Sequence, residues 1–243
     1  MVAATQTGVE YHMRFHDIVQ RLAAESERPA PGLGPYLAVS RLPGSRGTEV
    51  ARRVANRLGW NVLDRQLVED LAERLKLSPR LLELMDETRT DWLRETLLNL
   101  VEPRLVEQHG YVALLGRVML VAASEGRVVF VGRGAGFLLP PEAGIRVQVV
   151  ASREYRLRTV AEREGIDGRV ASRRLDSLDA DRATFLHRNF GREPADVDDH
   201  DLTVNTGTLG IDGASELVCR ALELRGLAEW RQASESLSDH VGH

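Results

Sequence analysis

Two short, valine-rich runs constrain the fold of this chain more than any other feature. Residues 127–134 read RVVFVGRG, and residues 146–152 read RVQVVAS. A strand of this composition has both faces buried, which is typical of a parallel sheet that carries helices on each side. The two runs therefore predict a three-layer α/β domain.

The rest of the chain alternates between strands and helices, as such a domain requires. Three further strands bring the candidates to five, and they are predicted at residues 36–40, 60–65 and 201–206. Helical patterns occur at residues 48–58, 66–125 (with several breaks), from 153 onward, at 167–189 and at 211–225. The chain has 243 residues, of which 43% are apolar, so it can bury a core of this size.

The charge pattern and the cysteine content argue against several classes of protein. Acidic and basic residues are interspersed at a net charge of −4, which does not favour binding to nucleic acid. No apolar run approaches the roughly 18 residues that span a membrane, and we read no secretory signal, so we expect a cytoplasmic protein without a membrane partner. The single cysteine, Cys219, excludes an internal disulfide and is expected to be a buried, inert thiol.

The turn after the first predicted strand matches a phosphate-binding loop that lacks its lysine. The pattern G-x-x-x-x-G-K-[ST], laid on residues 41–48, reads RLPGSRGT, so Thr48 keeps the hydroxyl and Gly47 stands in place of the lysine. A strand, a glycine turn and a helix form the context in which backbone N–H groups bind phosphate. Tight turns before helices use the same residues, so the loop alone does not decide the function.

Charged residues follow two other predicted strands. Asp64 and Arg65 end the second strand, and Arg133 lies in the VGRG turn after the third. Ligands of open α/β sheets bind at the carboxyl ends of strands, and the planar fork of an arginine suits phosphate. Ordinary surface ion pairs would place the same residues there.

An arginine-rich segment at residues 153–182 ends in the motif RRLDSLDADR. Its Asp176, Asp179 and Arg182 are spaced by three, which places them close to one face of a helix. Phosphoryl transfer needs positioned cations of this kind, although a solvated helix face would look similar.

In this order the motifs resemble the cytidylate kinase-like proteins, in the nucleoside monophosphate kinase group. The resemblance covers residues 36–223, and it rests on SRLPGSRGTEVARRVANRLG, VLDR, VVFVGRGAGFLLP, IRVQVVASREYRLR, RRLDSLDADR and DHDLTVNTGTLGID. It implies a three-layer P-loop NTPase fold with a five-stranded parallel sheet and a helical acceptor-binding insertion. The residues before position 36 add an N-terminal helical arm, because a helical pattern is followed there by a proline- and glycine-rich linker.

We divide the chain into three parts on this basis. Residues 1–34 form an N-terminal helical arm and a linker, in which the helix could mediate homo-oligomerisation. Residues 35–228 form the P-loop kinase-like domain, and residues 229–243 form a polar tail.

The resemblance also implies roles for individual residues. Arg41 or Arg46 would supply the charge of the missing lysine, and we favour Arg41 because a side chain at a strand end points toward the loop. The ATP-binding residues would be Gly44, Ser45, Gly47, Thr48, Asn205 and Thr206, with Thr48 reaching Mg²⁺. The acceptor would contact Asp64, Arg65, Arg133, Asp179 and Arg182. The catalytic cations would be Arg41, Arg46, Arg156 and Arg182.

Several positions depart from cytidylate kinase itself. Lysine is replaced by Gly47, and the acid that is associated with cytosine recognition is replaced by Gly134. The acid before the turn is Val131, and one lid arginine is Leu175. These departures leave the base specificity and the rate of turnover open.

We therefore expect a nucleotide kinase that transfers a phosphoryl group from ATP, with Mg²⁺, to a nucleoside monophosphate or a similar small acceptor. Two alternatives stay open at this point. One is a nucleotide-binding regulatory module that is catalytically weak or inactive, which Gly47 and Val131 favour. The other is a scaffold that assembles through the N-terminal helix.

Overall fold

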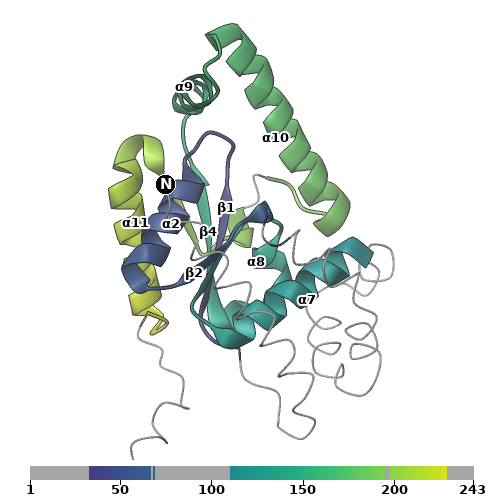
Figure 1. Ribbon diagram of the computed structural model, residues 1–243, viewed down its shortest axis with the longest axis vertical. Coiled ribbons are helices and arrows are strands. Elements are labelled where there is room, and N and C mark those ends of the chain that lie inside the picture. The colour runs from purple at the N-terminus through teal and green to yellow at the C-terminus, as the bar shows by residue number, and fades with distance from the viewer. Residues whose placement is uncertain (1–32, 67, 69–109, 195–196, 229–243) are drawn as a thin grey trace, which may run out of the picture.

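The computed structural model describes residues 33–66, 68, 110–194 and 197–228, and it contains a five-stranded sheet in which every strand pair is parallel (Figure 1). The strands follow the order β2-β3-β1-β4-β5. Their bounds are β1 Tyr36–Arg41, β2 Asn61–Leu63, β3 Val128–Val131, β4 Gly144–Val150 and β5 Leu202–Asn205. The fold class and the five parallel strands predicted from the sequence are thus confirmed.

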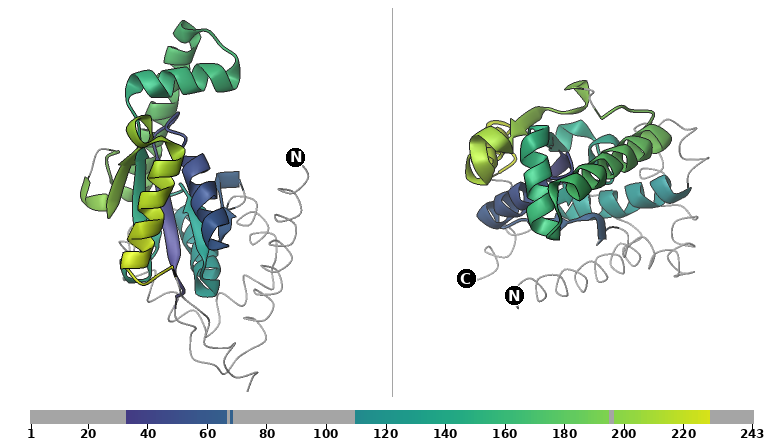
Figure 2. Two further views of the ribbon diagram at one scale, coloured as in Figure 1. Left: turned by 90° about the vertical axis from the view of Figure 1, so that its left-hand side faces the viewer. Right: turned by 90° about the horizontal axis from the view of Figure 1, so that it is seen from above.

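Helices cover both faces of this sheet. The first helix, α2 (Gly47–Leu58), packs with the last, α11 (Thr206–Leu224), on one face. Helices α7 (Gly110–Glu125) and α8 (Ala135–Leu138) pack on the other face. Figure 1 shows α2 and α11 on one side of the strands and α7 and α8 on the other, and the left panel of Figure 2 looks onto the α2 and α11 side.

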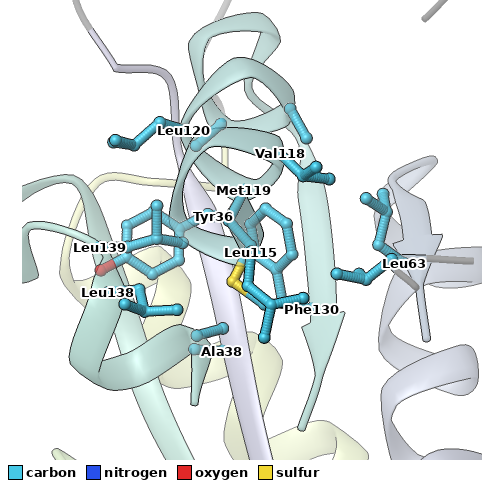
Figure 3. Packing of buried hydrophobic residues seen from close by; sticks show 14 of the residues in the cluster. Tyr36, Ala38, Leu63, Leu115, Val118, Met119, Leu120, Phe130, Leu138 and Leu139 are labelled. Atoms are coloured by element: carbon cyan, nitrogen blue, oxygen red, sulfur yellow. The ribbon is translucent and has the colours of Figure 1, made fainter. Parts of the chain in front are cut away.

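The core follows from the alternation of side chains along the central strand, β1. Leu37 and Val39 pack against the α2 and α11 face, and Tyr36 and Ala38 pack against the α7 and α8 face. Figure 3 shows the second cluster, in which the rings of Tyr36 and Phe130 meet edge to face with centroids 6.2 Å apart. The Tyr36 hydroxyl donates a hydrogen bond to the Pro140 carbonyl at 2.7 Å, which satisfies its one buried polar group.

Two helices extend beyond the carboxyl ends of the strands. Helix α9 (Arg153–Glu164) follows β4, and helix α10 (Gly168–Phe190) returns toward the sheet (Figure 1). Ser152 and Asp167 cap their N-termini by accepting backbone N–H groups, as short polar side chains do at this position. The two helices cover the edge of the sheet where a site is expected.

Some expectations differ in detail from the structure or lie outside the described residues. The second strand is shorter than predicted, and the short helix α8 was not predicted. Residues 1–32 of the arm and linker, the helical pattern at residues 69–109 and the polar tail lie outside the described residues. Cys219 is buried in α11, as predicted, and burial raises the pKa of its thiol. No helix within the described ranges is long and apolar enough to cross a membrane.

Candidate functional site

A cavity of about 600 Å³ opens at the carboxyl ends of β1 and β3, beneath helix α10. Its lining is rich in cations and includes Arg41, Arg46, Arg65, Arg133, Arg146, Arg163 and Arg182. The acidic lining residues are fewer: Glu49, Asp181 and Asp199. The positive excess suits an anionic ligand.

The loop between β1 and α2 forms one wall of the cavity. Gly44 and Arg46 both have left-handed backbone angles, with φ +78° and +59°, and α2 begins at the next residue, Gly47. A turn of this kind, followed by a helix N-terminus, directs backbone N–H groups toward an anion. Gly44, Gly47 and Thr48 line the cavity, as predicted for a phosphate-binding loop.

Three predicted ATP-binding residues support the loop instead of lining the cavity. The Thr206 hydroxyl donates to the Ser45 carbonyl at 2.7 Å, which ties the loop to the start of α11. Ser45 is fully buried, and the Asn205 side chain caps α11 by accepting the Gly207 N–H at 2.9 Å. Their predicted contact with the donor nucleotide stays a prediction.

Arg41, Arg133 and Arg182 lie close together in the cavity. Burial, followed by the positive charges of Arg182 and Arg133, lowers the pKa of Arg41 to about 10. Burial also lowers the pKa of Arg182, which donates from Nη2 to the Ser40 hydroxyl at 3.0 Å. Nη1 of Arg182 has no hydrogen-bond partner within the described part of the chain. Like charges held together in a partly desolvated site are stabilised by a bound anion.

The backbone at Arg133 is strained in a way that points to function. Gly132, Arg133 and Gly134 all have left-handed φ angles, of +79°, +56° and +73°. This conformation costs roughly 1–2 kcal/mol at a residue that carries a side chain, and such strain is concentrated at functional sites. The Arg133 guanidinium lies over the Phe185 ring at 5.0 Å from its centroid, which fixes its position at the cavity wall.

The position after Arg133 has no space for a side chain. A Cβ atom at Gly134 would lie 2.2 Å from Cζ of Phe190. Phe190 also packs against Phe137, with ring centroids 5.0 Å apart. The aromatic ring therefore fills the space in which the resemblance implies an acid that reads cytosine.

Arg156 on α9 and Asp179 on α10 form an ion pair. Nη1 of Arg156 donates to both carboxylate oxygens of Asp179, at 2.8 and 3.0 Å, and reaches the Pro43 carbonyl at 3.3 Å. The Arg156 side chain is only 10% exposed, so the pair joins α9, α10 and the phosphate loop. Neither residue lines the cavity, and their predicted contacts with nucleotide stay a prediction.

We expect Arg156→Ala to destabilise the protein by about 1–2 kcal/mol, because it leaves the half-buried Asp179 carboxylate without its partner. Hydrogen exchange at residues 153–182 should also become faster. Thermal unfolding and exchange measurements on Arg153→Ala provide the matched control, since Arg153 forms an exposed ion pair with Asp176 on the same helices. Equal effects of the two substitutions would contradict a joining role for Arg156.

Of the remaining predicted site residues, Arg46 and Arg65 line the cavity and Asp64 does not. Arg46 is exposed and donates from Nε to Glu49 at 2.7 Å, so its guanidinium is held by the first turn of α2. Arg65 lines the cavity, and Asp64 at the end of β2 lies 3.6 Å from Arg52.

The sequence analysis did not identify several residues of the cavity. Ser40 could have been found, because it is a hydroxyl at the end of a predicted strand and it now accepts from Arg182. Phe185 could not, because its contact with Arg133 depends on the path of α10 across the sheet. Arg146, which pairs with Asp201 at 2.7 Å, also lines the cavity with Asp199 and His200.

The chain is similar in sequence and in fold to known proteins. The chain is 27% identical over 187 residues to a cytidylate kinase of Ignicoccus hospitalis, a match that covers 76% of this chain and 98% of that protein. It is 25% identical over 197 residues to a cytidylate kinase of Methanopyrus kandleri, covering 77% and 92%. A crystal structure of an uncharacterized protein from Eubacterium ventriosum is 18% identical and has a TM-score of 0.61, over 78% of this chain and 98% of that one, and it shares the fold. The model of the Cytidylate kinase-like family matches residues 36–208, so the chain belongs to this family.

Proposed function

We propose that the protein transfers a phosphoryl group from ATP to a nucleoside monophosphate or a similar small acceptor that carries a phosphate. The observation that supports this best is the grouping of Arg41, Arg133 and Arg182 in the same cavity as the phosphate loop. A transferred phosphoryl group spreads negative charge over its oxygens, and positioned cations stabilise that charge. The relatives named cytidylate kinase support the same reaction class.

The donor phosphates would bind to the loop wall. The loop backbone and the N-terminus of α2 offer N–H groups that do not depend on a lysine side chain, except at Ser45, whose N–H donates to the Leu42 carbonyl at 3.1 Å. Thr48 lines the cavity, where its hydroxyl is suited to a Mg²⁺ ion that arrives with the nucleotide phosphates. When bound, Mg²⁺ neutralises charge on the donor phosphates.

The acceptor phosphate would bind to the opposite wall. Arg133 and Arg182 each offer a planar donor fork, which suits a bidentate contact with a phosphate group. Ser40 and Phe185 hold these two side chains, so little side-chain entropy is lost when the acceptor binds.

One observation favours a second function, nucleotide binding without turnover. Gly47 brings no charge to the loop, whereas the usual lysine interacts directly with the transferring oxygens. A module of this kind would bind ATP and a monophosphate and form no product.

A screen of ATP against the common nucleoside monophosphates separates the two functions. The purified full chain is incubated with ATP, Mg²⁺ and each monophosphate in turn, and ADP formation is measured against a control without acceptor. We expect ADP formation that depends on at least one monophosphate. Binding of both ligands by calorimetry without any acceptor-dependent ADP would support the regulatory module instead.

A further inference from the structure

We propose that Arg41 is the catalytic cation of this cavity, and that its side chain leaves no space for a side chain at Gly47. This inference rests on the proposed function and assigns the group that acts in place of the loop lysine.

The stem of Arg41 occupies the lysine position. A Cβ atom at Gly47 would lie 2.5 Å from Cβ of Arg41 and 3.2 Å from its Cγ. Contacts below 3.0 Å between such atoms force a rearrangement, so a lysine at position 47 is incompatible with a side chain at position 41, and its Cβ would also lie 3.0 Å from Cβ of Val149. The absence of the lysine is therefore coupled to the side chain at position 41.

The guanidinium of Arg41 reaches the turn at residues 132–134, which carries Arg133. A Cβ atom at Gly132 would lie 2.0 Å from Nη1 of Arg41 and 3.1 Å from its Cζ. The side chain thus leaves β1 beside the phosphate loop and ends beside the turn that carries Arg133. A phosphoryl group that moves from donor to acceptor has to pass between these two walls.

The other candidate cation is held elsewhere. Arg46 donates to both carboxylate oxygens of Glu49, at 2.7 and 2.5 Å, and its side chain is 39% exposed. Arg41 is held among Arg133 and Arg182, whose like charges favour an anion between them. With a pKa of about 10, Arg41 remains a cation at neutral pH.

The chemistry balances without any further reactant. An oxygen of the acceptor phosphate forms a bond to the γ-phosphorus of ATP, while the bond from that phosphorus to the β–γ bridging oxygen breaks. ADP leaves with the electron pair of the broken bond. Arg41 donates N–H groups to the oxygens in transit and keeps its protons throughout.

The first test is Arg41→Ala in the full chain. We expect the turnover number to fall by about 10²-fold or more, the range for loss of one charge-stabilising group, while the ATP dissociation constant changes less than threefold. Guanidinium ions added to the Arg41→Ala protein should restore part of the turnover, and an equal ionic strength of sodium chloride should not. Arg57→Ala, which removes an exposed arginine at the far end of α2, is the matched control and should turn over like the wild type.

The second test moves the cation from position 41 to position 47. Gly47→Lys alone should be inactive, because the lysine meets the Arg41 stem. Arg41→Gly with Gly47→Lys removes that stem, including its Cβ, and should turn over at least tenfold faster than Arg41→Gly alone.

Unchanged turnover in Arg41→Ala would overturn the inference while the proposed function stands. The inference would also be overturned if Arg41→Ala loses turnover and if neither added guanidinium nor the Arg41→Gly, Gly47→Lys double variant restores it. A wild type that forms no product with any acceptor would overturn both.

Discussion

Replacing Arg133 with alanine is expected to weaken the binding of a nucleoside monophosphate at least tenfold and to leave ATP binding nearly unchanged. Arg133 lines the cavity from the turn after β3, and under the proposed function it binds the acceptor phosphate while the loop after β1 binds ATP. A hydrogen bond to a charged group contributes about 1.5–3 kcal/mol, which corresponds to a factor of ten or more in affinity. Isothermal titration with each ligand separately measures the two effects.

The left-handed backbone at Arg133 requires its own control. Arg127, which directly precedes β3, has nearly the same φ angle as Arg133, +55°, but does not line the cavity. Arg127→Ala should bind both ligands like the wild type, because the substitution leaves the acceptor wall unchanged. If Arg133→Ala weakened ATP and the monophosphate equally, the assignment of Arg133 to the acceptor would be wrong.

Placing alanine at Gly134 is expected to destabilise the protein by about 2 kcal/mol or more. The left-handed backbone, with φ +73°, costs roughly 1–2 kcal/mol for any side chain, and the contact with the Phe190 ring adds an overpacking cost of about 1–3 kcal/mol. For the same reason, Gly134→Asp should displace the ring rather than create a cytosine-reading acid. Thermal and chemical unfolding report the change in stability.

Two further variants isolate the contribution of the ring. Gly59 has φ +68° and no atom within 4 Å of its would-be Cβ, so Gly59→Ala measures the backbone cost alone. In a Phe190→Ala background, Gly134→Ala should cost no more than Gly59→Ala does. An undiminished cost in that background would show that Phe190 does not close the position.

The sequence predicted the sheet well because its strands are buried on both faces. The apolar runs at residues 127–134 and 146–152 became β3 and β4, and the glycine turn after β1 became a left-handed loop at the start of α2. Both features are local: composition specifies the strand, and glycine with a following helix specifies the loop.

Contacts between segments that are far apart in the sequence could not be predicted in the same way. Arg156 and Asp179 pair with each other because α9 and α10 pack side by side, which the sequence did not predict, and their contacts with nucleotide stay a prediction. Phe190 was not identified, since its position over Gly134 depends on where α10 returns to the sheet. The space shared by Arg41, Gly47 and Gly132 likewise becomes visible only when three separate segments meet.

The central claim, transfer of a phosphoryl group within one cavity, is tested most directly by following the γ-phosphate of labelled ATP. The wild-type protein is incubated with the labelled ATP, Mg²⁺ and each nucleoside monophosphate, and the products are separated by chromatography. We predict that the label moves to the monophosphate to form a labelled nucleoside diphosphate, and that Arg133→Ala slows this transfer. Label that stays in ATP, or that appears only as inorganic phosphate, would contradict the account.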